Sequence, residues 1–169
     1  MKDHMVSIGL LGVGRVGEGV IKLLREQAEL LRRRSALTYR LKTAVDVDWS
    51  RPREVPLDGI VLGEDPALVL EDPEIDIVIE TIGGIEPAGT YVAEALRRRK
   101  HVVTANKALI AARGRELFRL AREHGVDLLF EASVGGGIPI IKGLREGLVG
   151  NNIKSIYGIL NGTTNYILT

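Results

Sequence analysis

The feature that most constrains this chain is a glycine pattern close to its start. The pattern, Gly12-Val13-Gly14-Arg15-Val16-Gly17, directly follows an apolar run over residues 6–11 and precedes a segment of helical periodicity. In such a strand–turn–helix setting the first glycine allows a tight turn, the second lets a ligand approach the backbone, and the third lets helix and strand pack closely. Free N–H groups at the helix start attract phosphate. The segment therefore predicts a dinucleotide-binding turn, with a purely structural glycine turn as the alternative.

Segments typical of strands and helices alternate through most of the sequence. We expect strands over residues 6–11, 41–46, 75–80, 101–104, 127–131 and 153–160. We expect helices over residues 18–34, 66–70, 87–100, 107–124 and 140–148. This alternation predicts right-handed βαβ crossovers and a doubly wound parallel sheet covered on both faces, which is an α/β fold of the Rossmann type.

The glycine-rich stretch Gly135-Gly136-Gly137 is the best domain boundary. We expect residues 1–134 to form the dinucleotide-binding domain. Residues 135–169 are too few for an independent core, so we expect them to begin a second domain.

Composition narrows the classes of function further. The 169 residues carry a net charge of +1 and no cysteine, which excludes a disulfide scaffold and thiolate chemistry and fits a cytoplasmic protein. The two basic runs, residues 32–34 and 97–100, each end a helical segment, so a nucleic-acid partner is not expected. No apolar run approaches the roughly 20 residues of a membrane helix, so no membrane partner is expected either.

The choice between NAD and NADP is open at this point. Asp46 ends the second expected strand, where a carboxylate can accept hydrogen bonds from the ribose hydroxyls of NAD. Arg51 and Arg53 follow closely and could instead pair with the 2′-phosphate of NADP. A third alternative is that Asp46 caps a turn and both arginines are solvated.

Two further strand ends carry polar residues. Thr81-Ile82-Gly83 follows the third main strand, and Thr104-Ala105-Asn106-Lys107 ends or follows the next one. Ligands of open α/β sheets bind outside the carboxyl ends of the strands, so we expect both segments to contact the nicotinamide half of the cofactor. The ammonium of Lys107 could hold a carboxamide, a substrate carbonyl or a carboxylate, unless it is simply a solvated lysine.

The segment from Glu131 to Ile138 combines one carboxylate with three consecutive glycines. Such oxygen donors suit a hard cation, but composition alone favours a hinge between domains. The three histidines, His4, His101 and His124, lack the spacing of a metal site.

Taken together, these stretches resemble homoserine dehydrogenase, the enzyme that interconverts aspartate β-semialdehyde and homoserine. The resemblance runs the full length of the chain and includes Phe-Glu-Ala-Ser-Val-Gly-Gly-Gly-Ile-Pro and Gly-Ile-Leu-Asn-Gly-Thr-Thr-Asn-Tyr-Ile-Leu-Thr, which are its most specific parts. The resemblance implies an NAD- or NADP-dependent dehydrogenase of threonine, methionine and isoleucine biosynthesis, a homodimer when full length.

The resemblance also implies roles for particular residues. Arg15 and Val16 would line the pyrophosphate, and Thr81 and Lys107 would contact the nicotinamide end. A structural sodium ion would be held by Glu131 and by backbone oxygens of Val134, Gly136 and Ile138. Residues 158–169 would begin a domain for substrate binding and dimerisation.

Members of that family continue well beyond residue 169, and the resemblance places their catalytic lysine and acidic substrate-binding residues there. We therefore expect this chain to be a catalytically incomplete fragment. The alternative is a stand-alone, non-catalytic dinucleotide-binding module.

Overall fold

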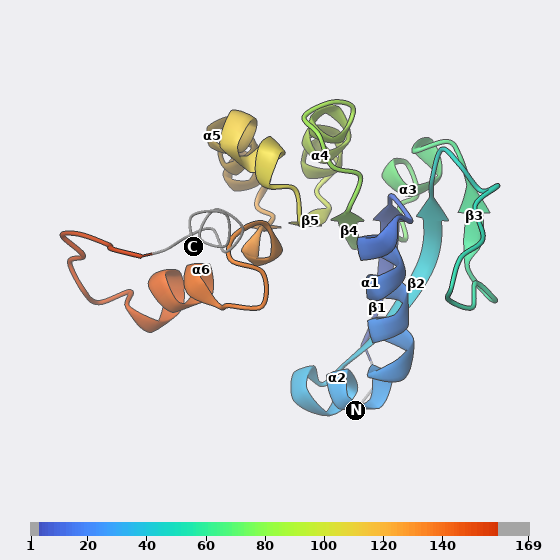
Figure 1. The fold of residues 1–169 in the computed structure, drawn as a ribbon, viewed down its shortest axis with the longest axis horizontal. Helices are drawn as coiled ribbons and strands as arrows, with labels where there is room; N and C mark the ends of the chain where they lie inside the picture. Colours follow the sequence, from blue (N-terminus) through green and yellow to red (C-terminus); the bar gives the residue numbers. More distant parts are fainter. Residues whose placement is uncertain (1–3, 159–169) are drawn as a thin grey trace, which may run out of the picture.

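The computed structural model describes residues 4–158, and its centre is a parallel sheet (Figure 1). Within this part of the chain six strands form one sheet in the order β3-β2-β1-β4-β5-β6, all parallel. The strands are β1 His4–Leu11, β2 Leu37–Val45, β3 Val61–Gly63, β4 Ile77–Glu80, β5 His101–Thr104 and β6 Leu128–Leu129. The strand order reverses direction between β1 and β4, which is the topology of the doubly wound Rossmann fold and confirms the predicted fold class.

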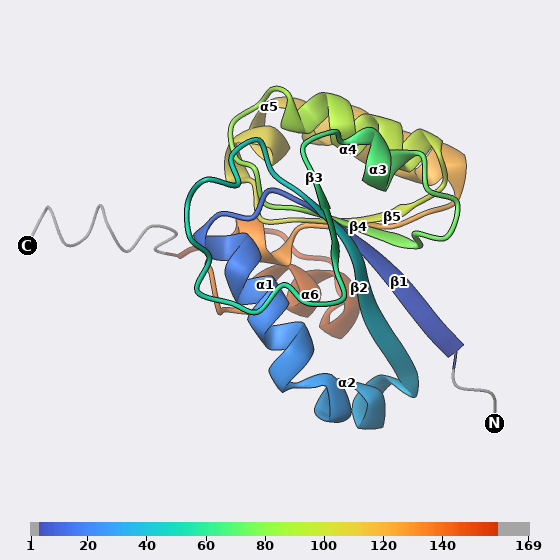
Figure 2. The ribbon, with the colours of Figure 1, turned by 90° about the vertical axis from the view of Figure 1, so that its right-hand side faces the viewer.

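Helices cover the sheet from two sides, as Figure 2 shows. α3 Ala67–Leu70, α4 Ala88–Arg97 and α5 Lys107–His124 lie on one side. α1 Arg15–Glu26, α2 Ala28–Ser35 and the short α6 Ile140–Lys142 lie on the other. A 3₁₀ turn at Glu131–Ser133 precedes α6, and a π-helical turn at Gly143–Gly147 follows it. None of the helices described is both long enough and apolar enough to cross a membrane.

The core is divided between the two faces because successive strand residues point to opposite sides. The larger cluster packs β4 and β5 against α4 and α5 and includes Val78, Leu96 and Leu117, all with no exposed surface. The smaller cluster, Leu10, Val13, Ile21 and Ala44, packs α1 against β1 and β2. Val13 belongs to the glycine turn itself, so the turn is anchored in the core.

The helix expected over residues 18–34 is in fact two helices. The chain leaves helical geometry at Gln27, with φ −108° and ψ 15°, and resumes as α2. α1 has a buried face that includes Ile21, whereas α2 has no buried residue at all. Without apolar contacts to hold a straight continuation, the helical periodicity of the sequence is not enough to extend α1, and the chain turns back toward β2.

The strands differ from the expectation in two places. The sequence did not indicate β3, whose residues Val61 and Leu62 are exposed at the sheet edge and give a weak apolar signal. The second difference is the strand expected over residues 153–160. Residues 153–158 are exposed and pair with no strand among the described residues. The rest of the expected range lies outside the described part of the chain. Apolar β-branched residues specify a strand only where a partner edge is within reach.

Candidate dinucleotide-binding site

The glycine turn between β1 and α1 is as tight as the sequence pattern requires. Gly12 has φ +92°, and a Cβ atom there would lie 2.9 Å from the backbone nitrogen of Ile82. At Gly17 a Cβ atom would lie only 2.3 Å from the Gly12 carbonyl oxygen. The first and last glycines are therefore required by close contacts within the protein, and both predictions about them agree with the geometry.

Gly14 is different because its surroundings are open. A Cβ atom there would meet no atom within 4 Å. Gly14 is the N-cap residue of α1, and no side chain caps this helix end. The first N–H groups of α1, at Arg15, Val16 and Gly17, thus begin a helix whose positive end faces an open surface, which is the arrangement that binds phosphate.

A cavity of about 310 Å³ lies over this turn. Five residues that the sequence analysis assigned to the cofactor line it: Gly12, Gly14, Asp46, Thr81 and Ile82. Its other lining residues are Val45, Val47, Glu64, Pro66, Pro87 and Tyr91. Since glycine leaves the turn uncovered and the cavity is continuous with it, the residues present fit a dinucleotide.

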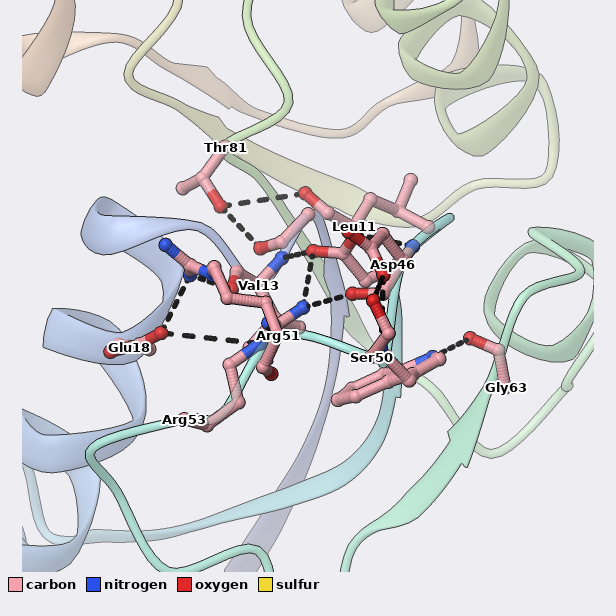
Figure 3. Close-up of polar contacts among 12 residues, drawn as sticks. Leu11, Val13, Glu18, Asp46, Ser50, Arg51, Arg53, Gly63 and Thr81 are labelled. Carbon is pink, nitrogen blue, oxygen red and sulfur yellow. Dashed lines mark hydrogen bonds and ion pairs between the residues drawn. The ribbon is translucent and has the colours of Figure 1, made fainter.

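Asp46 follows β2 directly and is bound to the glycine turn (Figure 3). Its Oδ2 accepts a hydrogen bond from the Val13 N–H at 2.6 Å, and its Oδ1 accepts one from the Asp48 N–H at 3.1 Å. The Arg53 guanidinium lies 3.4 Å from Oδ2. Asp46 therefore caps a turn, which was one of the three alternatives for this residue. It also lines the cavity over the glycine turn.

The two arginines after Asp46 have partners inside the protein. Arg51 Nη2 donates to Glu18 Oε1 at 2.7 Å and to the Val13 carbonyl at 3.2 Å. The side chain of Arg53 is only 5% exposed, lies over the Trp49 ring, and donates to the carbonyls of Arg51 and Asp48. The alternative of solvated arginines is therefore wrong for Arg53.

Thr81 joins the third strand end to the glycine turn. Its Oγ1 donates to the Gly12 carbonyl at 2.7 Å, while its N–H donates to the Leu11 carbonyl at 2.9 Å. Gly12 in turn donates its N–H to the Val45 carbonyl at 2.8 Å. The ends of β1, β2 and β4 are thus hydrogen-bonded around one turn.

Sequence reasoning missed the organising role of Glu80, which is fully buried. Its Oε1 accepts from the N–H groups of Ile82 at 2.8 Å and Gly83 at 3.1 Å, and its Oε2 accepts from Thr104 Oγ1 at 2.5 Å. A buried carboxylate is stable only when it is fully hydrogen-bonded, and here it fixes the ends of β4 and β5 relative to each other. The signal available was an acidic residue closing an apolar strand immediately before a glycine-rich turn.

Asn106 and Lys107 begin α5. Asn106 is the N-cap, with Oδ1 accepting from the Leu109 N–H at 3.1 Å and Nδ2 donating to the Gly84 carbonyl at 2.6 Å. Lys107 is exposed in the first turn. Thr104, Asn106 and Lys107 do not line the cavity over the glycine turn, so the described structure does not bring them together with Asp46.

The residues expected to hold sodium lie after β6. Glu131 accepts hydrogen bonds from the N–H groups of Ile141 at 2.9 Å and Lys142 at 2.7 Å, so it caps α6. The Ile138 carbonyl accepts from the Ile140 N–H at 2.8 Å, and Val134 and Gly136 lie in the bend between. Carboxylate and carbonyl oxygens each have further lone pairs, so these hydrogen bonds leave the oxygens able to bind a hard cation.

The fold, the glycine turn and the cavity over it define a nicotinamide- or flavin-type dinucleotide-binding domain. Comparison with known families narrows this class. Residues 12–131 match the family model "Homoserine dehydrogenase, NAD binding domain", and residues 139–169 match the model "Homoserine dehydrogenase". The chain belongs to the homoserine dehydrogenase family.

Relatives from several bacteria agree with this assignment. The chain is 46% identical to the homoserine dehydrogenase of Bacillus subtilis and 49% identical to that of Synechocystis, in each case over 97% of this chain. It covers 38% and 37% of the length of those two proteins. This chain thus corresponds to less than half of each relative.

Solved structures give the same result. A homoserine dehydrogenase from Thiobacillus denitrificans superimposes with a TM-score of 0.91 at 48% identity, over 98% of this chain and 39% of that one. A hyperthermophilic archaeal homoserine dehydrogenase in complex with NADPH superimposes with a TM-score of 0.73 at 28% identity, over 89% of this chain and 51% of that one.

The contrast between two glycines on one helix tests the geometry of the turn. We expect Gly17→Ala to lower the free energy of unfolding by about 3 kcal/mol, because the new Cβ would collide with the Gly12 carbonyl. We expect Gly19→Ala to raise it by about 0.5–1 kcal/mol, because that position is open and helical. Urea unfolding followed by circular dichroism measures both; equal effects would contradict the tight contact.

Proposed function

We propose that this chain is the cofactor-binding part of a homoserine dehydrogenase, which transfers hydride between a nicotinamide cofactor, NAD or NADP, and the homoserine–aspartate β-semialdehyde pair. The observation that carries the proposal is the open Gly14 position at the start of α1, beside a cavity that the ends of β1, β2 and β4 surround. The family assignment supplies the substrate class. The pathway would be the biosynthesis of threonine, methionine and isoleucine.

Each half of the site would have its own task. The α1 N-terminus would bind the pyrophosphate through the N–H groups of Arg15 and Val16, and Asp46 would bind the adenosine ribose. Thr81, Ile82 and Gly83 would lie along the nicotinamide half, together with Thr104 and Asn106. When bound, the nicotinamide supplies or accepts the hydride.

Lys107 would orient or polarise the substrate carbonyl with its exposed ammonium at the first turn of α5. The proton that the product alkoxide needs would come from a lysine outside these 169 residues. Residues 1–134 would be the dinucleotide-binding domain, and 135–169 would begin the domain for substrate binding and dimerisation. We also propose that the full-length protein is a homodimer and lies in the cytoplasm.

A variant of the open glycine tests cofactor binding. We expect Gly14→Val to weaken the binding of a nicotinamide dinucleotide by at least about tenfold, because its side chain would occupy the cavity where the pyrophosphate approaches. The matched control, Gly19→Val, lies on the same helix in open space and should bind like the parent protein. Isothermal titration calorimetry measures the affinities, and unchanged binding by Gly14→Val would refute this placement of the pyrophosphate.

Turnover separates the enzyme from its alternative, the non-catalytic module. These 169 residues span 38% of the length of a full relative, so a proton donor in the remainder of such a protein would be missing from an assay of these residues alone. We expect the 169-residue chain to bind cofactor but to reduce it with homoserine far more slowly than the ~1–10³ per second usual for enzymes. Absorbance at the reduced-nicotinamide band measures the rate, and a rate in the usual range would show that the proton donor lies within this chain.

The sodium proposal predicts a specific salt effect. We expect sodium chloride to raise the melting temperature above that in tetramethylammonium chloride at equal ionic strength, because a cation that binds only the folded state stabilises it. Glu131→Gln should abolish this difference, whereas Glu123→Gln, in an exposed i,i+4 pair on α5, should keep it. Equal melting temperatures in the two salts would contradict a sodium site.

A further inference from the structure

The cavity over the glycine turn has an uneven distribution of charge. Two of its lining residues are ionisable acids, Asp46 and Glu64, and its lining contains no lysine or arginine. The remaining lining residues are glycines, apolar residues, prolines, one threonine and one tyrosine. A ligand group that enters this cavity therefore meets negative charge and no compensating cation on its walls.

Asp46 cannot easily withdraw from the cavity. Both of its carboxylate oxygens accept backbone hydrogen bonds, from Val13 at 2.6 Å and from Asp48 at 3.1 Å. Its side chain is 15% exposed, so part of the carboxylate surface faces outward. A carboxylate oxygen accepts more than one hydrogen bond, which leaves Asp46 able to accept from a sugar hydroxyl.

The two nearby arginines, Arg51 and Arg53, do not line this cavity. Arg51 and Arg53 line a neighbouring cavity of about 970 Å³ against the β3 edge, together with Trp49. Glu64 lies between the two cavities and lines both of them. Arg53 is held there by Asp46 and by the Trp49 ring, and its Nε, which has no hydrogen-bond partner among the described residues, lies 3.9 Å from Glu18 Oε1.

Glu18 and Asp46 thus balance the charges of Arg51 and Arg53. Glu18 accepts from Arg51 at 2.7 Å, and Asp46 lies 3.4 Å from Arg53. To reach a phosphate on the cavity side, either arginine would have to leave a carboxylate partner. Glu64 then adds a negative charge that neither arginine contacts in the described structure.

We propose that this chain selects NAD over NADP, with Asp46 as the specificity-determining residue and Glu64 as a second source of negative potential. The proposal rests on the proposed function, since it assigns the adenosine half of the cofactor to this cavity. The 2′-hydroxyl of NAD donates a hydrogen bond to Asp46. The 2′-phosphate of NADP has a charge of about −2 and would stand beside a fixed carboxylate in a cavity whose described lining includes no lysine or arginine.

Direct binding measurements on the protein test this selectivity. We expect NAD to bind at least about tenfold more tightly than NADP, because specificity here comes from repulsion of the wrong ligand as well as from the bond to the right one. Titration calorimetry with each oxidised cofactor gives both constants. Energy transfer from the single tryptophan, Trp49, to each reduced cofactor gives an independent reading.

Asp46→Asn isolates the charge of the carboxylate. The amide oxygen can still accept the shorter bond, from the Val13 N–H, while the amide NH2 replaces the acceptor of the longer bond from the Asp48 N–H. We expect the ratio of NAD to NADP affinity to fall by about tenfold or more. Glu64→Gln should lower the ratio by a smaller factor. The matched control is Asp48→Asn, a neighbouring carboxylate that does not line this cavity and should leave the ratio unchanged.

Arg51→Gln tests the opposite arrangement, in which Arg51 turns to hold a 2′-phosphate. We expect it to leave NADP affinity unchanged within about twofold, and a selective loss of NADP binding would overturn the proposal.

Equal or tighter binding of NADP by the parent would also overturn the proposal, while leaving the proposed function intact. Binding of neither cofactor would instead contradict the proposed function itself.

Discussion

The contact between Gly17 and the Gly12 carbonyl is the constraint on which the rest of the site depends. Only the absence of a Cβ lets α1 start so close to the end of β1, since an added Cβ would lie 2.3 Å from that oxygen. This closeness directs the α1 N-terminus to the point where strand order reverses between β1 and β4. At such a point neighbouring connections run to opposite faces of the sheet and leave room for a ligand.

Hydrogen bonds then fix three strand ends around the turn. Gly12 donates to Val45 at the end of β2, and Thr81 donates to Gly12 from the end of β4. The buried carboxylate of Glu80, at the end of β4, accepts a hydrogen bond from Thr104 and so fixes the end of β5 as well. A site held at this many points loses little conformational entropy when a ligand arrives, which improves affinity without additional contacts.

The sequence predicted the parts of the structure that local chemistry determines. The glycine turn follows from backbone requirements that only a few residue types meet, and the helix expected over residues 107–124 is α5, Lys107–His124. The position of Asp46 followed in the same way from where a strand of apolar residues must end. These features depend on neighbours in sequence, so no knowledge of the tertiary structure is needed to find them.

What the sequence did not predict depends on distant partners. The break at Gln27 reflects the lack of buried residues in α2, and residues 153–158 pair with no strand in the described part of the chain. Glu80 could be seen as an acidic residue in an apolar strand, but its function follows only from the approach of Thr104, 24 residues later. Periodicity describes what a segment can form, whereas tertiary contacts decide what it does form.

Asp46 illustrates how one residue can serve structure and recognition together. Its bond to Val13 helps to hold the glycine turn, and that same bond fixes the direction in which the remaining lone pairs point. Pairing with Arg53 from behind offsets part of the cost of keeping a carboxylate at a half-buried site. A carboxylate held in this way presents negative charge to the cavity whether or not a ligand is present. Discrimination between cofactors would then be set by the folded structure itself, with no rearrangement required when the cofactor binds.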